Sequence, residues 1–222
     1  MAKPATKRAR YRIERDSMGE LQVPASALWG AQTQRALDNF HLSGRPMPPA
    51  FVQALALVKA SAAVVNGHLG LLDRERADAI VEPATAIAGG AHGDQFPVDR
   101  YQTGSGTSSN MNANEVIAHL ATQASGLPIH ANDHVNLGQS SNDVIPTALR
   151  VMTVVGARND LLPALRHLRK AIDKRGKAFA GVVKTGRTHL MDAMPLTVAQ
   201  EFGAWSAQLD SAQARIEDSL KR

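Results

Sequence analysis

The sequence predicts a mainly α-helical protein, with a small mixed N-terminal domain followed by the beginning of a long-helix bundle domain. Hydrophobic residues make up 44% of the 222 residues and aromatic residues only 4%, so the core must be aliphatic. Apolar residues also recur every three or four positions in several segments, as they do in amphipathic helices. The clearest such stripe comprises Val198, Phe202, Trp205, Leu209, Ala212, Ile216 and Leu220.

The first ten residues carry most of the net positive charge. The formal net charge is +5, and residues 1–10 contain Lys3, Lys7, Arg8 and Arg10 but no acidic residue. We expect these ten residues to be a basic disordered tail. Nucleic acid is not an expected partner, because no recognisable nucleic-acid-binding module follows the tail.

The composition also excludes several kinds of site. The sequence has 0 cysteines, which excludes disulfides, thiolate metal sites and a cysteine nucleophile. No uncharged apolar run approaches the roughly 18 residues that a membrane span needs. The basic segment 1–16 has no apolar stretch behind it and so does not resemble a secretory signal. We therefore expect a cytoplasmic protein with no membrane partner.

The first elements are a hairpin and two helices. Residues 11–49 are irregular, with a short hairpin expected around Gly19. A helix then begins at Ala50, where apolar residues start to recur at helical spacing, and Gly67 is expected to end it. A second helix is predicted from residue 74 to residue 88, with a kink at Pro83.

The following helices are separated by polar loops. Residues 89–111 are predicted to be a loop, and a helix begins near Asn112. Pro146 suits the first turn of the next helix, which is expected to run with interruptions to about Ala180. The last helix begins at a capping box, Thr197-Val-Ala-Gln200. Its apolar stripe is still running at the end of the sequence, so we expect the 222 residues to be the front part of a longer chain.

The first polar loop leads into a helix through two glycines. Gly104 and Gly106 allow close approach of a ligand to the backbone, and hydroxyl and amide side chains follow them. The unpaired N–H groups at a helix start favour an anion. The sequence matches neither a dinucleotide-binding fingerprint nor a phosphate-binding Walker loop. The alternative interpretation is an ordinary helix cap within a flexible loop.

The second polar loop covers residues 130–143 and again ends at a helix start. Its residues Ser140, Ser141 and Asn142 are expected near that helix N-terminus. His130 and His134 have the spacing of a metal pair on a helix, but the intervening Asn-Asp favours a turn, and no third ligand is evident. We therefore predict no metal site.

The third polar loop, residues 184–195, contains His189 and Arg187. Histidine is the side chain whose ordinary pKa lies near neutrality, and arginine can hold a carboxylate with two parallel hydrogen bonds. The alternative is an exposed histidine beside a surface ion pair. Between residues 101 and 149 there is no Lys or Arg, so an anion site there depends on neutral donors. Lys184 and Arg187 are the candidate cations, unless the cation lies outside this chain.

Taken together, the three loops resemble the conserved regions of a known enzyme family. The segments Gly104-Ser-Gly-Thr-Ser-Ser-Asn-Met-Asn112, Gln139-Ser-Ser-Asn-Asp143 and Gly186-Arg-Thr-His-Leu-Met-Asp-Ala193 are similar to those of the fumarase/aspartase superfamily, and most similar to class II fumarases. The segments beginning at Arg12 and Leu28 also resemble the family's opening. The resemblance implies an N-terminal lyase domain over 11–139 and the first, truncated part of the central helical bundle over 140–222.

The resemblance implies reversible hydration of fumarate to L-malate, without a cofactor, in the tricarboxylic acid cycle. His189 corresponds to the family's proton donor and acceptor. It also favours fumarase, because aspartases usually carry glutamine there. The residues implied in binding the dicarboxylate are Ser105, Gly106, Thr107, Ser140, Ser141, Asn142 and Thr188.

A second anion site is implied by the segment His130, Ala131, Asn132 and Asp133. Family members have proline where this chain has Ala131, so a fixed backbone dihedral angle is lost. The resemblance further implies a homotetramer in which loops from three subunits form each site.

The family's third conserved region, with its catalytic serine, is absent from these residues. We therefore expect a polypeptide of these 222 residues to be inactive alone. The alternatives are an aspartate ammonia-lyase-like enzyme and a non-catalytic helical interaction module.

Overall fold

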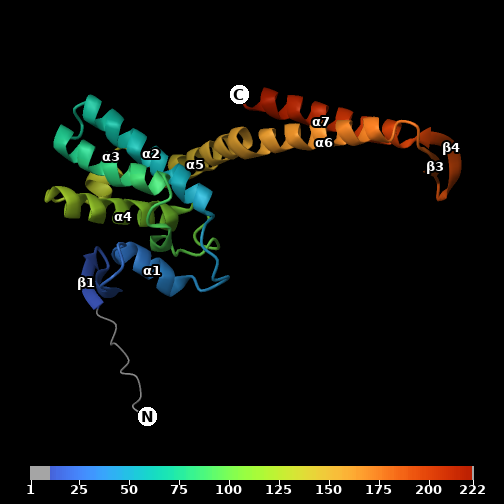
Figure 1. Ribbon diagram of the computed structural model, residues 1–222. Coiled ribbons are helices and arrows are strands. Elements are labelled where there is room, and N and C mark those ends of the chain that lie inside the picture. The colour runs from blue at the N-terminus through green and yellow to red at the C-terminus, as the bar shows by residue number, and fades with distance from the viewer. Residues whose placement is uncertain (1–10, 222) are drawn as a thin grey trace, which may run out of the picture. The chain divides into compact units, whose positions relative to one another are not determined.

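A computed structural model describes residues 11–221, so the predicted basic tail, residues 1–10, lies outside the described residues. The chain divides into two compact units, Met1–Met152 and Thr153–Arg222, which are described separately below. Helices dominate both units, as the sequence predicts (Figure 1). The predicted domain boundary between residues 139 and 140 stays a prediction.

The predicted hairpin near the N-terminus is confirmed. Strands β1 (Tyr11–Asp16) and β2 (Gly19–Pro24) pair antiparallel, with Asp16 opposite Gly19. Gly19 has a φ of +113°, which suits glycine at the end of so tight a turn. Hydrogen bonds from Arg35 to Asp16 tie the hairpin to the next helix and hold the pKa of the Asp16 carboxyl below its ordinary value.

Helix α1 (Ala31–Asn39) lies in the segment that was expected to be irregular, so that expectation was wrong. No side chain within the helix caps its N-terminus. Instead, the carboxylate of Glu115, on α4 (Thr107–Ser125), accepts hydrogen bonds from the backbone N–H groups of Gly30, Gln32 and Thr33 and from the Thr33 hydroxyl. A negative charge at these N–H groups also matches the helix dipole. The helix is therefore stabilised from a residue distant in sequence.

We expect Glu115→Ala to lower the free energy of unfolding of the first unit by about 3 kcal/mol, because it leaves the α1 N-terminus without its charged acceptor. Thermal unfolding followed by circular dichroism measures the loss. Glu82→Ala, at an exposed position of α3 (Arg74–Ala88), is the matched control and should change stability by less than about 0.5 kcal/mol. Equal stabilities of the two variants would contradict the capping role of Glu115.

Helices α2 (Pro49–His68) and α3 (Arg74–Ala88) pack side by side, close to the predicted bounds (Figure 1). Pro83 lies inside α3 and is buried. The Asp73 side chain caps the N-terminus of α3 by accepting a hydrogen bond from Arg76 N. The core is aliphatic apart from Phe51 and Phe96, as expected. Its most deeply buried side chains include Phe51, Leu55, Ile80, Ile87, Val116 and Ile117.

Helix α2 is long and apolar enough, by length and composition, to cross a membrane. However, it packs against α3 and α4, and eight of its residues are buried, including Lys59. Core helices of globular proteins pass the same test, so this single helix is weak evidence for a membrane span. The absence of a membrane partner stays a prediction.

Helix α4 (Thr107–Ser125) begins five residues before the expected start near Asn112. That expectation was wrong because the first turn is polar and yet buried, with Ser109, Asn110 and Asn112 among its buried residues. Gly126, in the left-handed conformation with a φ of +73°, ends the helix. A short 3₁₀ helix, η1 (Gly93–Gln95), lies in the predicted loop before it.

The second polar loop is more ordered than predicted. It contains a π-helical turn, η2 (Ala131–Val135), and α5 (Ser141–Gly156) begins inside its expected range. The interrupted helix expected up to about residue 180 is confirmed as three consecutive elements. These are α5, a second π-helical segment η3 (Ala157–Leu161) and α6 (Leu162–Ala178). However, Pro146 lies inside α5 and not in its first turn, so that expectation was wrong.

The second unit contains α6, a hairpin and α7. Strands β3 (Val183–Thr188) and β4 (Met191–Thr197) pair antiparallel where the sequence predicted a polar loop, so that prediction was wrong. The predicted capping box at Thr197 and Gln200 is confirmed and starts α7 (Val198–Ser219). Helix α7 packs against α6, yet none of its residues is buried, and Trp205 is 46% exposed.

Candidate active site

The loop before α4 is held by the Gln102 side chain. Gln102 Oε1 accepts from Ser109 N at 2.9 Å, and Nε2 donates to Ser109 Oγ at 2.8 Å and to the Asp99 carbonyl at 2.9 Å. Gln102 therefore satisfies one of the free N–H groups at the start of the helix. This anchor, which sequence reasoning missed, fixes both ends of the turn that contains Ser105 and Gly106.

Asp99 anchors the same loop from the other side. Its carboxylate accepts from the backbone N–H groups of Tyr101, Ser43 and Gly44 and from the Ser43 hydroxyl. These donors, Tyr101 N first, lower the pKa of Asp99 to about 2. The carboxylate is thus charged throughout the neutral range, which keeps the loop tied to residues 43 and 44.

Gly106 brings the first polar loop against α5. Its φ of +66° lies in the left-handed region, and a Cβ atom there would meet three side-chain carbons of Ile145 at 3.0 to 3.2 Å. Only glycine therefore fits both the backbone conformation and the space. The close approach positions the start of α4 beside the start of α5.

Hydroxyl groups from the two loops meet at this junction. Thr107 Oγ1 lies 2.9 Å from Ser105 Oγ and 2.9 Å from Ser141 Oγ, so the three hydroxyls form one hydrogen-bonded chain. Ser140 Oγ accepts from Asn142 N at 3.2 Å. The structure therefore brings together Ser105, Thr107 and Ser141 and places Ser140 and Asn142 next to them.

The junction has the chemistry of an anion site built from neutral groups. Ser105, Thr107 and Asn142 are exposed and can donate to a ligand. Two helices begin there, at Thr107 and Ser141, and helix N-termini favour negative charge. Hydroxyl and amide donors can thus hold a carboxylate without an arginine in direct contact.

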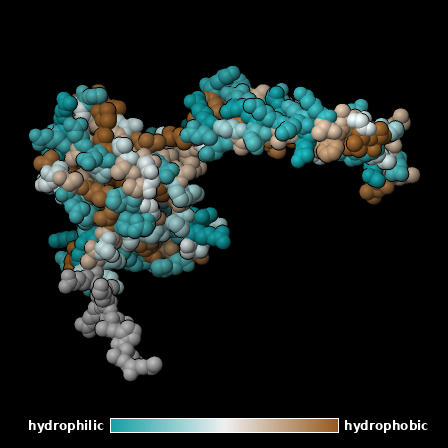
Figure 2. All heavy atoms as spheres, viewed as in Figure 1, coloured by the Kyte–Doolittle hydropathy of each residue, from teal (hydrophilic) through white to brown (hydrophobic). Residues whose placement is uncertain are grey.

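Thr188 and His189 lie in the second unit, at the tip of the β3–β4 hairpin. His189 and Leu190 form the two-residue turn, with φ of 51° and 61°, between the paired residues Thr188 and Met191. Both turn residues are therefore left-handed, where Asn and Gly are usual. His189 is exposed, and Leu190 is fully exposed. The end of this unit that carries β3 and β4 shows apolar side chains on its surface (Figure 2).

The two candidate cations of the hairpin already have acidic neighbours. Lys184 Nζ donates to Glu201 Oε2 at 2.8 Å, and Arg187 Nε lies 3.6 Å from Asp192 Oδ1. The Arg187 pair is solvent-exposed, so it holds that side chain only weakly. Within the hairpin unit, Arg187 is therefore the more readily available of the two for a carboxylate ligand.

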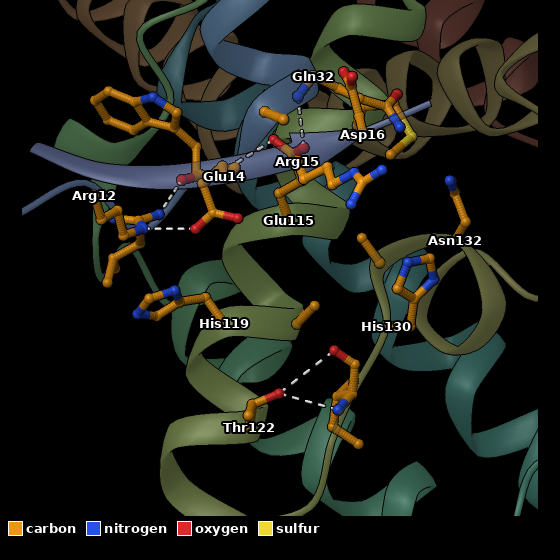
Figure 3. A pocket seen from close by; sticks show the side chains of 18 of the residues that line it. Arg12, Glu14, Arg15, Asp16, Gln32, Glu115, His119, Thr122, His130 and Asn132 are labelled. Atoms are coloured by element: carbon orange, nitrogen blue, oxygen red, sulfur yellow. Dashed lines mark hydrogen bonds and ion pairs between the residues drawn. The ribbon is translucent and has the colours of Figure 1, made fainter. Parts of the chain in front are cut away.

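Three residues of the predicted second anion site, His130, Ala131 and Asn132, line an open cavity of about 610 Å³ (Figure 3). His130 Nδ1 accepts from Asp133 N, which holds the turn together. Arg12 also lines the cavity, but it donates to Glu14 and to three backbone carbonyls. The second anion site stays a prediction.

A further histidine, His119, points toward the same cavity (Figure 3). Burial and the nearby charge of Arg12 lower its pKa below the ordinary value. The imidazole is therefore neutral at physiological pH, and an anion in this cavity would gain little from it.

Comparison with known proteins defines the class. Residues 19–222 match the family model described as Lyase, so the chain belongs to this lyase family. Among curated relatives, the class II fumarate hydratase of Xylella fastidiosa (strain Temecula1) is 65% identical over 213 residues. That of Halobacterium salinarum is 57% identical over 212 residues, covering 93% of this chain. The resemblance to class II fumarases is thereby confirmed.

Comparison with solved structures supports the same family. Class II fumarase from Schistosoma mansoni superposes with a TM-score of 0.90 at 40% identity, over 95% of this chain and 46% of its own. A fumarate lyase:delta crystallin from Brucella melitensis gives a TM-score of 0.89 at 44% identity, over 96% of this chain and 51% of its own. The match to the Xylella protein covers 96% of this chain and 45% of that protein, so the chain spans about half the length of the relatives it matches.

Proposed function

We propose that this chain supplies the N-terminal part of a fumarate hydratase, which adds water reversibly to fumarate and gives L-malate. The observation that carries the proposal is the hydroxyl chain of Ser105, Thr107 and Ser141 at two adjoining helix N-termini. Such donors stabilise the extra negative charge that develops on a carboxylate when a proton leaves the neighbouring carbon.

The proposed roles follow from the chemistry of each group. Thr107, Ser141 and Asn142 bind one carboxylate of the dicarboxylate through hydroxyl and amide donors. Thr188 binds substrate from the hairpin. His189 moves a proton through a water molecule, because an imidazole can give and take a proton near neutral pH. As in the family, we propose a cytoplasmic homotetramer of the tricarboxylic acid cycle in which each site combines loops from three subunits.

A chimeric enzyme tests the proposal. Residues 1–222 would be followed by the part of the Xylella fastidiosa fumarate hydratase that lies beyond the matched region, since the two proteins are 65% identical where they overlap. We expect the chimera to convert fumarate to L-malate, measured by the loss of fumarate absorbance. Residues 1–222 alone and the Xylella segment alone are the controls, and neither should turn over.

Two further measurements on the chimera separate the alternatives. Ammonia release from L-aspartate by the chimera would favour an aspartate ammonia-lyase. A chimera that assembles to the size of the Xylella enzyme by size-exclusion chromatography but hydrates no fumarate would contradict the proposed function. That outcome would favour a non-catalytic helical module.

A further inference from the structure

Lys59 is a buried lysine that the proposed mechanism does not use. It lies in the middle of α2, and its side chain is 0% exposed. Its Nζ atom donates to Asn136 Oδ1 at 3.0 Å and to Gln139 Oε1 at 2.9 Å. Among the residues that the structure describes, no carboxylate forms an ion pair with it. Two amide oxygens therefore replace the water around the ammonium group.

Asn136 is the centre of this buried network. Besides Lys59, the Nδ2 groups of Asn110 and Asn114, on α4, donate to Asn136 Oδ1 at 3.1 Å each. Three donors thus converge on one amide oxygen. Asn136 Nδ2 in turn donates to the Gln139 carbonyl at 3.1 Å. The network therefore joins α2 and α4 to the segment that precedes α5.

Gln139 connects the network to the candidate active site. Its Oε1 accepts from Lys59, and its Nε2 donates to the Val135 carbonyl at 2.8 Å. Ser140 and Ser141 follow directly, and Ser141 reaches Thr107 at 2.9 Å. Because both the oxygen and the nitrogen of its side-chain amide are hydrogen-bonded, Gln139 fixes the direction in which the chain enters α5.

The burial of Lys59 is unfavourable by itself. Removal from water disfavours the charged form and lowers the pKa of Lys59 to about 7. A methionine or leucine would fill the same space in an apolar helix without this cost. Lys59 must therefore contribute what an apolar side chain could not, namely hydrogen-bond donors directed at Asn136 and Gln139.

We propose that Lys59 is a positioning residue, which holds residues 136–142 in the arrangement that places Ser141 beside Thr107. It touches neither hydroxyl, so it acts on the dicarboxylate site through Gln139. The role in catalysis rests on the proposed function, whereas the effect on the loop does not.

The loop arm of the test uses the 222-residue chain and amide hydrogen exchange measured by NMR. For each amide we compare the exchange rate in Lys59→Met with the rate in the wild type. This ratio should be at least about tenfold larger for the amides of Asn142, Asp143 and Val144, which donate to Ser140, than for the amides of α3. The matched control is Leu55→Ala, one helical turn away and equally buried. It should speed exchange throughout the first unit without singling out residues 142–144.

The activity arm uses the chimera. Lys59→Met should lower kcat/KM for fumarate by about tenfold or more, mainly through a higher KM, because the substrate-binding hydroxyls are misplaced. Leu55→Ala, assayed below its unfolding temperature, should change both constants by less than about threefold. If Lys59→Met does not fold, Gln139→Met removes the same contact from the loop side and is expected to give the same pattern.

Unchanged relative exchange at residues 142–144 in both Lys59→Met and Gln139→Met would overturn the proposal. An inactive wild-type chimera would count against the proposed function alone, and the exchange arm would still decide the role of Lys59. Equal KM changes in Lys59→Met and Leu55→Ala would show that Lys59 contributes only through packing of the core.

Discussion

His189→Asn is expected to lower kcat of the chimera for fumarate hydration by about a hundredfold or more, because asparagine cannot carry a proton between substrate and water. Binding should suffer less, since the amide keeps hydrogen-bonding capacity at the same place. Steady-state kinetics with fumarate and with L-malate would show a similar loss in both directions.

The same substitution should not destabilise the protein. His189 has a φ of 51° at the tip of the hairpin, and asparagine adopts the left-handed conformation more readily than other non-glycine residues. We expect the melting temperature of His189→Asn to equal or exceed that of the wild type. A loss of activity without a loss of stability identifies a functional group rather than a structural one.

Leu190→Asn is the matched control, because it introduces asparagine at the adjacent left-handed residue, which has a φ of 61°. Its stability should respond in the same direction, while kcat should stay within about threefold of the wild type. Equal losses of activity in the two variants would show that the hairpin tip matters only as a contact surface. Full activity of His189→Asn would remove His189 from the mechanism.

Gly106→Ala is expected to disrupt the meeting of the two hydroxyl-bearing loops. The new methyl group would lie 3.0 to 3.2 Å from Ile145 carbons, in a backbone conformation that alanine disfavours. We expect the first unit to lose about 2–3 kcal/mol of stability, and the KM of the chimera for fumarate to rise about tenfold or more. Chemical denaturation and steady-state kinetics measure the two effects.

Gly104→Ala is the control for this change. It lies two residues earlier in the same loop, its φ is not in the left-handed region, and no atom lies within 4 Å of its added Cβ. It should therefore leave stability within about 0.5 kcal/mol, so a change in its KM would report ligand approach to the loop rather than packing on α5. If the two alanine variants behaved alike, the packing of the first loop on α5 would have no role in substrate binding.

The sequence predicts the helices that depend on their own residues. Helices α2 and α3 follow the apolar periodicity and the local stop signals, and the capping box of α7 lies within four consecutive residues. Helix α1 was missed because its cap, Glu115, is more than eighty residues away along the chain. The start of α4 was missed because Gln102 holds a polar first turn that carries no apolar pattern.

The hairpin was missed for a different reason. Neither strand of β3–β4 shows the alternation of apolar and polar residues that marks a half-buried strand. The turn also lacks the Asn-Gly or Asp-Gly pair that usually indicates two left-handed residues. The residues His189 and Leu190 occupy these positions instead, and a sequence pattern based on turn preference cannot detect them.

In the candidate site, too, the sequence predicts the local motifs but not the contacts between them. Each loop is a weak pattern by itself, and only the order of all three motifs pointed to a dicarboxylate site. The contact of Thr107 with Ser141 and the fit of Gly106 against Ile145 depend on how α4 packs beside α5. The role inferred for Lys59 also needs the structure. A single lysine within an apolar helix would be expected to face solvent, and only the structure shows its buried partners Asn136 and Gln139.

The most direct test of the central claim is a crystal structure of the assembled chimera with L-malate bound. We expect one carboxylate of the ligand within hydrogen-bonding distance of Thr107, Ser141 and Asn142. The imidazole of His189, from the same or a neighbouring subunit, should lie within reach of the reacting carbons directly or through one water molecule. L-malate bound elsewhere, with these hydroxyls contacting only protein or solvent, would contradict the account.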